Sequence, residues 1–118
     1  MTNLAGIDRL VEAITADAYD ICEQMTALHA AFTNEVTEPT WATLVGIPIL
    51  VLDPDIRDTG MEMTVHCRHG NDEQEISFTD HVFPPDTMAA WIHAAYRRCL
   101  GLKPFPTAMP LGWEPDWL

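Results

Sequence analysis

Apolar residues recur at alternating steps of four and three along the first third of the chain. The positions concerned are Ile7, Val11, Ile14, Ala18, Ile21, Met25, Leu28 and Phe32. This spacing places them along one side of an α-helix, and no proline or glycine interrupts it after Gly6. The pattern therefore predicts one long helix over residues 1–33, with its apolar side against the rest of the domain.

The middle of the chain has the pattern of β-structure. Residues 41–52 are rich in β-branched and large apolar side chains, and Pro48 suits a sheet edge or a bulge because proline has no amide donor. Residues 61–69 alternate polar and apolar, and Gly70-Asn71-Asp72 separates them from a second alternating stretch. We expect a β-hairpin there, within a small antiparallel sheet of two or three strands over residues 41–80.

A second helix and an extended tail complete the predicted fold. Pro84-Pro85-Asp86 suits a first helical turn and Arg97 and Arg98 suit a last one, which predicts a helix over residues 86–100. Residues 102–118 combine several prolines with large aromatic side chains and should be extended. The order of elements predicts a single small α+β domain over residues 1–118.

Charge indicates what kind of partner the domain could have. The chain has 18 acidic and 6 basic residues, a formal net charge of −12 over 118 residues. Such a chain lacks the cationic face of a nucleic-acid-binding protein. We expect it to be attracted instead to basic surfaces, over a Debye length of ~8 Å at physiological salt. The alternative is that the charge only keeps the protein in solution.

Two groups of carboxylates and two tryptophans are the candidate partner-binding residues. One group is expected on the outer side of the long helix and the other in an acidic turn after residue 52. The tryptophans lie in the tail, where aromatic side chains suit binding hot spots or fold back onto the domain. The residues are Asp8, Glu12, Asp20, Glu23, Asp53, Asp55, Asp58, Trp113 and Trp117.

The chain contains no recognisable nucleophile motif. Ser77 is the only serine and has no Gly-x-Ser-x-Gly sequence around it. In the second predicted helix, Cys99 is expected to face inward and His93 outward, which keeps them apart. The glycines are scattered and form no phosphate-binding loop. We therefore expect no enzymatic activity.

Histidines near the predicted hairpin form the densest group of potential metal ligands. His66 points away from Cys67 if the segment is a strand, because side chains alternate between faces. His69 could share the face of Cys67, and His81 could join them across the hairpin. The acids of residues 53–58 lack the central glycine and closing glutamate of a calcium loop. We expect no metal and no cofactor.

Together these features predict a cytoplasmic, non-catalytic inhibitor that occupies a basic, nucleic-acid-binding surface of another protein. In composition alone the chain resembles phage anti-defence inhibitors such as anti-CRISPR proteins, and immunity proteins that neutralise toxins. That resemblance implies carboxylates standing in for phosphates. One alternative is a dimeric secretion or assembly chaperone that uses the apolar helix stripe. A second is a small metal-dependent enzyme using His66, His69 and His81.

Overall fold

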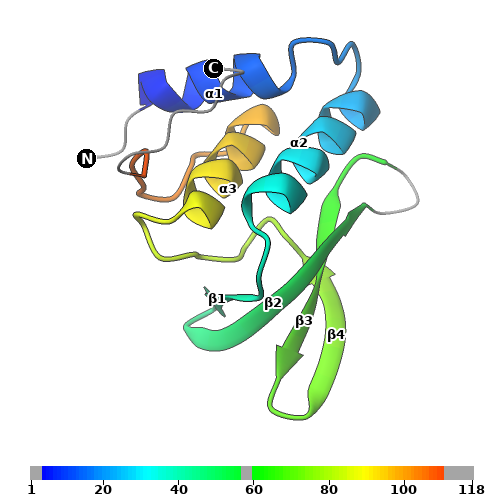
Figure 1. Ribbon diagram of the computed structural model, residues 1–118, viewed down its shortest axis with the longest axis vertical. Coiled ribbons are helices and arrows are strands. Elements are labelled where there is room, and N and C mark those ends of the chain that lie inside the picture. The colour runs from blue at the N-terminus through cyan, green and yellow to red at the C-terminus, as the bar shows by residue number, and fades with distance from the viewer. Residues whose placement is uncertain (1–3, 57–59, 111–118) are drawn as a thin grey trace.

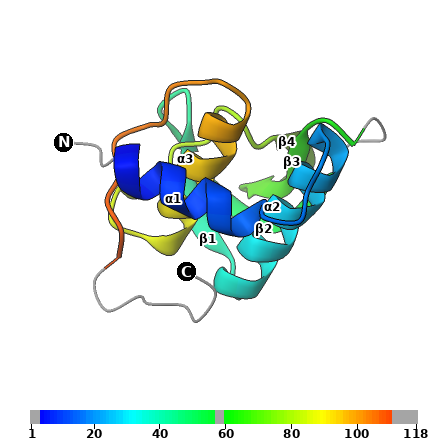
Figure 2. The ribbon, with the colours of Figure 1, turned by 90° about the horizontal axis from the view of Figure 1, so that it is seen from above.

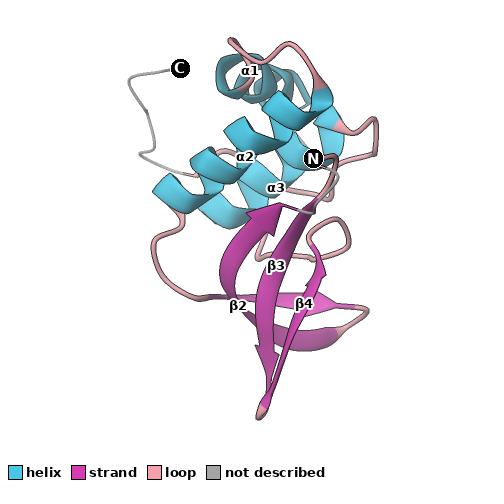
Figure 3. Cartoon of the chain, turned by 90° about the vertical axis from the view of Figure 1, so that its right-hand side faces the viewer, coloured by secondary structure: helices cyan, strands magenta, loops and turns pink. Residues whose placement is uncertain are grey.

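The computed structural model describes residues 4–56 and 60–110 and consists of three helices and one sheet (Figure 1). The helices are α1 (Leu4–Ile14), α2 (Ile21–Glu35) and α3 (Met88–Cys99), and the strands are β1 (Thr40–Leu44), β2 (Ile47–Ile56), β3 (Met63–His69) and β4 (Asp72–Ser77). All three helices lie on the same side of the sheet (Figures 1 and 3). The predicted α+β class is confirmed.

The predicted long helix is two helices, α1 and α2, joined by residues 15–20. The hydroxyl of Thr15 donates a hydrogen bond to the Val11 carbonyl oxygen at 2.6 Å where α1 ends. The carboxylate of Asp20 accepts a hydrogen bond from the Glu23 amide at 2.8 Å and caps the start of α2. Such local bonds compete with a continuous helix. The prediction of one helix over residues 1–33 was therefore wrong. The break was missed because the apolar spacing continues in phase across it.

The sheet is an antiparallel meander in the order β1-β2-β3-β4, with four strands where two or three were expected. The missed turn is Val45-Gly46, which has φ values of 51° and 77°. Valine rarely adopts a positive φ, so the sequence gives no turn signal there. Pro48 lies opposite Thr43, whose amide and carbonyl both bond to Val82 at 2.8 Å. Proline thus occupies a position that needs no donor.

The β3–β4 hairpin and α3 agree closely with expectation. β3 buries Met63, Val65 and Cys67 while His66 and Arg68 stay exposed, as the alternation predicts. Thr64 departs from it, because it is buried and its hydroxyl donates to Glu75 at 2.6 Å. α3 begins after Thr87, whose hydroxyl accepts a hydrogen bond from the Ala90 amide at 3.2 Å. Seen from above, α1 crosses over α3 (Figure 2).

A cluster of aromatic rings packs α2 and α3 against the segment that follows β4. The ring of Phe78 lies 5.1 Å from that of Phe32 and 5.0 Å from that of Tyr96. His93 joins this cluster and is 2% exposed, with Nε2 donating to the Phe78 carbonyl oxygen at 2.8 Å. The expectation that His93 faces outward was wrong, because the segment after β4 covers that side of α3.

The described part of the tail, residues 102–110, has no helix or strand and packs on α3. The ring of Phe105 stacks on that of His93, with 5.7 Å between the ring centroids. The Arg97 guanidinium lies over the same Phe105 ring, 4.1 Å from its centroid. Trp113 and Trp117 lie outside the described residues. Among the described residues, no helix is long and apolar enough to cross a membrane.

Candidate partner-binding groove

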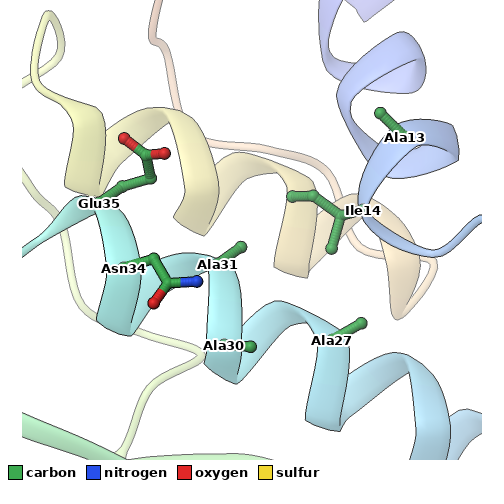
Figure 4. Close-up of a pocket in the computed structure, with 7 residues that line it drawn as sticks. All are labelled: Ala13, Ile14, Ala27, Ala30, Ala31, Asn34 and Glu35. Atoms are coloured by element: carbon green, nitrogen blue, oxygen red, sulfur yellow. The ribbon is translucent and has the colours of Figure 1, made fainter. Parts of the chain in front are cut away.

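A groove lies between the end of α1 and the outer side of α2 (Figure 4). It consists of two adjoining hollows of about 330 and 480 Å³, which share lining residues from both helices. Ala13 and Ile14 of α1 form one wall, and Ala27, Ala30 and Ala31 of α2 form the floor (Figure 4). We call this feature the α1–α2 groove.

The groove exists because α2 has two different apolar sides. Its large side chains, Met25, Leu28 and Phe32, are buried in the core. The alanine side lies roughly 140° around the helix axis at 3.6 residues per turn. α1 and α2 both pack on α3, and Ile14 is the side chain of α1 that reaches both the core and the groove. Alanine side chains are too short to fill the remaining space.

Carboxylates lie at the end of the α1–α2 groove that is formed by the loop between the helices. Asp17 and Glu23 line this end, and Glu35 lines the opposite one. Tyr19 is 89% exposed beside them, and its amide donates to the Glu23 Oε2 atom at 3.4 Å. Among the described residues, no lysine or arginine lines the groove. The floor is therefore apolar and the loop end is anionic.

Two of the four acids predicted on the helix have structural roles. Asp8 accepts hydrogen bonds from Arg98 Nε at 2.7 Å and Nη2 at 3.3 Å, which lowers the pKa of Asp8. This contact ties α1 to α3, so Asp8 does not simply face solvent as expected. Asp20 caps α2. Glu12 is exposed on α1 and Glu23 lies at the groove, as the partner-binding hypothesis requires.

The second acidic group lies in a strand and not in the expected turn. β2 continues to Ile56, with a register shift between Val51 and Asp53, after which Pro54 pairs with Val65. The Pro54 carbonyl accepts a hydrogen bond from His29 Nε2 of α2 at 3.1 Å. Asp53 and Asp55 are exposed; Asp53 pairs with the exposed His66 of β3 and Asp55 with the buried Thr64. Asp58 lies outside the described residues.

Some of the potential metal ligands lie close together, but in the described part of the chain they form no three-residue site. The thiol of Cys67 lies 3.4 Å from Nε2 of the buried His81, but burial raises the pKa of Cys67 to about 11 and lowers that of His81. Both groups are neutral near pH 7 and do not form a thiolate–imidazolium pair. His66 contacts Glu73 at 3.0 Å on the other face. His69 lines a hollow of about 180 Å³ together with Cys67, so these two share a face as expected. No group of three or more potential ligands is placed to hold a metal in the described part of the chain.

The alanine floor and Tyr19 were missed at the level of sequence. A signal was present, because Ala27, Ala30 and Ala31 follow the same i, i+3, i+4 spacing as a core stripe. Asp20 followed by Glu23 three residues later is also a capping sequence that marks a helix start. Recognising that start would have placed Tyr19 in an exposed loop.

The comparison with protein-family models gives no match, and the search of curated proteins gives no significant match. Among solved structures, the chain is similar to the crystal structure of Anabaena CcbP, with a TM-score of 0.64 and 17% sequence identity. The alignment covers 87% of this chain and 96% of that one. At this identity the similarity shows a shared α+β fold alone.

Proposed function

We propose that this protein is a non-catalytic inhibitor that places its anionic helical side on a basic, nucleic-acid-binding surface of a target protein in the cytoplasm. The observation that carries the proposal is the α1–α2 groove, where the carboxylates of Asp17 and Glu23 adjoin an apolar floor. Tyr19 is exposed in the loop between the two helices, next to these carboxylates in the chain. The carboxylates would take positions that phosphates take on the target. The target surface would then be closed to nucleic acid.

Charge and apolar surface contribute differently to such binding. The net charge of −12 would speed the encounter with a basic surface, an effect that falls with added salt. Retention would come from desolvated apolar and aromatic contacts, of which Tyr19 is the strongest candidate in this region. A non-catalytic role is supported by the neutral, buried state of Cys67 and His81.

The two alternative functions have less structural support. A chaperone that holds its client with the apolar helix stripe would need that stripe exposed, but Ile7, Met25 and Leu28 are 0% exposed in the core. A metal-dependent enzyme would need His66 and His81 to converge, and they lie on different sides of β3. Among its described residues, the structure therefore has neither the exposed apolar stripe that the chaperone needs nor the converging histidines that the metal-dependent enzyme needs.

The proposal is tested by identifying the target and measuring how charge affects its association. The immobilised protein is used to capture proteins from an extract of its source cells, and captured proteins are identified by mass spectrometry. The purified target is then measured for association rate at several salt concentrations. Nucleic acid is added as a competitor. We expect a nucleic-acid-binding target whose association slows with salt and is blocked by nucleic acid.

Two triple variants, one with three carboxylates of the helical side neutralised and one with three of the sheet neutralised, have the same change of net charge. Comparing them distinguishes the effect of where the charge lies from the effect of the total charge. The helical triple should slow association at low salt by about 10-fold, and the sheet triple by less than about two-fold. Equal effects of both triples, or binding that nucleic acid does not disturb, would contradict the proposal. Asp8 and Asp20 are left unchanged because they stabilise the fold. The helical triple is Glu12→Gln, Asp17→Asn and Glu23→Gln, and the sheet triple is Asp53→Asn, Asp55→Asn and Asp72→Asn.

A further inference from the structure

We infer that the α1–α2 groove binds an amphipathic α-helix of the target, with its apolar side on the alanine floor and its lysines or arginines at the anionic loop end. The inference rests on the proposed function, because it names the part of the basic target that the groove receives. Three properties of the groove carry it: its length, its floor and its charge.

The length of the α1–α2 groove matches a short helix. It follows α2 from Glu23 to Asn34, which is about 16 Å at 1.5 Å per residue. An occupant lying along α2 would therefore contact it over about three helical turns. Ala27, Ala30 and Ala31 present only methyl groups along this path (Figure 4). Small side chains allow a second helix to approach at the short end of the usual 8–10 Å interaxial distance.

The floor favours a helix over an extended segment. The backbone amides and carbonyls of α2 are already bonded within the helix, so the floor offers an extended chain no backbone partners. An extended segment lying there would leave its own amides and carbonyls unsatisfied over apolar surface, which is costly. A helix satisfies these groups internally and presents only side chains. The occupant that fits the floor is therefore helical.

The charge of the loop end favours a basic partner over a second copy of this chain. Asp17 and Glu23 lie at this end, and the side of α2 that would meet a second copy carries the same carboxylates. Self-association through this surface would bring like charges together. Lysine or arginine side chains at one end of an incoming helix would instead meet opposite charge. The Tyr19 ring, exposed in the loop between α1 and α2 where the Tyr19 amide bonds Glu23, offers a further surface on which an arginine can stack.

The test uses a synthetic peptide of leucine and lysine, roughly 18 residues long, patterned as an amphipathic helix. A peptide of the same composition in scrambled order is the matched ligand control. Ala30→Trp fills the exposed floor of the α1–α2 groove without changing charge, and Ala5→Trp places the same side chain at an exposed site of α1 outside it. Binding is measured by fluorescence anisotropy on the full chain, and circular dichroism checks that each variant is folded.

We expect the amphipathic peptide to bind wild type at least about 10-fold more tightly than the scrambled one. Ala30→Trp should remove this difference and Ala5→Trp should keep it. On wild type, the methyl resonances of Ala27, Ala30 and Ala31 should shift on peptide addition, which provides a measurement that needs no variant. Asp17→Asn with Glu23→Gln should weaken binding and reduce its salt dependence.

Each contrary result has a separate meaning. If both peptides bind equally and Ala30→Trp has no effect, the groove inference is overturned while charge-driven binding stands. If the alanine methyl resonances do not move, the peptide binds elsewhere and the inference is again overturned. If neither cationic peptide binds at low salt, the proposed function fails together with the inference.

Discussion

Lowering the pH should destabilise the fold through a buried histidine. Burial among the rings of Phe78 and Phe105 lowers the pKa of His93 from 6.5 to about 4, with Arg97 acting in the same direction and the hydrogen bond to the Phe78 carbonyl opposing it. The unfolded chain exposes this imidazole, which then regains its ordinary pKa. Between pH 6.5 and about 4 the unfolded state therefore binds more protons than the folded state. Stability is complete above this window and is lost as the pH falls through it.

The size of the effect follows from the difference between the two pKa values. A shift from 6.5 to about 4 corresponds to about 3 kcal/mol at 1.36 kcal/mol per unit. About 2 kcal/mol of this should be lost between pH 7 and pH 4.5. His81 adds to the loss because burial also lowers its pKa. The pKa of Asp8 is lowered from 3.8, so its contribution is lost only at more acidic pH.

Urea unfolding across this pH range measures the loss. His93→Gln keeps a donor for the Phe78 carbonyl and removes the titration, so its stability should depend less steeply on pH. His66→Gln changes an exposed histidine and should follow wild type. Parallel pH profiles for wild type and His93→Gln would refute the reasoning. If His93→Gln does not fold, the ring resonances of His93 in wild type should stay unchanged until the pH approaches about 4.

Three further predictions concern single side chains. Asp20→Ala removes the cap of α2 and should lower the free energy of unfolding in urea by about 1 kcal/mol; unchanged stability would mean that the cap contributes nothing. Leu28→Ala truncates a side chain that is 0% exposed and should cost ~2–5 kcal/mol by calorimetry, whereas a near-neutral effect would show a loosely packed stripe. Val45→Asn replaces a valine with a φ of 51° and 91% exposure, so thermal unfolding should show a gain of about 1 kcal/mol. A loss would show that this turn tolerates valine without strain.

The elements that the sequence predicted correctly depend on signals a few residues apart. The β3–β4 hairpin follows from alternation and a glycine turn, and α3 follows from prolines before it and arginines at its end. The break between α1 and α2 was hidden because the apolar spacing stays in phase through it. The turn at Val45 was hidden because the residue is one that rarely adopts a positive φ.

The candidate site was harder to predict because it depends on contacts between distant segments. Asp8 looks like a solvent-facing acid until α3 brings Arg98 to it, 90 residues along the chain. The α1–α2 groove needs both helices to pack on α3, a placement that periodicity alone does not specify. What the sequence could indicate was the kind of surface, acidic and exposed, and for Glu12 and Glu23 this agrees with the structure.

The two arginines of α3 are engaged in contacts within the fold and leave the carboxylates at the loop end of the α1–α2 groove without a neutralising partner from α3. Arg98 is held by Asp8 of α1, and Arg97 bonds the carbonyl oxygens of Thr79 and Lys103. Both cations therefore stabilise joints between segments of the fold. They are not available to neutralise the carboxylates at the α1–α2 groove, among whose described lining residues no lysine or arginine occurs. No described residue that lines this end of the groove is a cation, so a basic helix is the partner that the charge distribution favours.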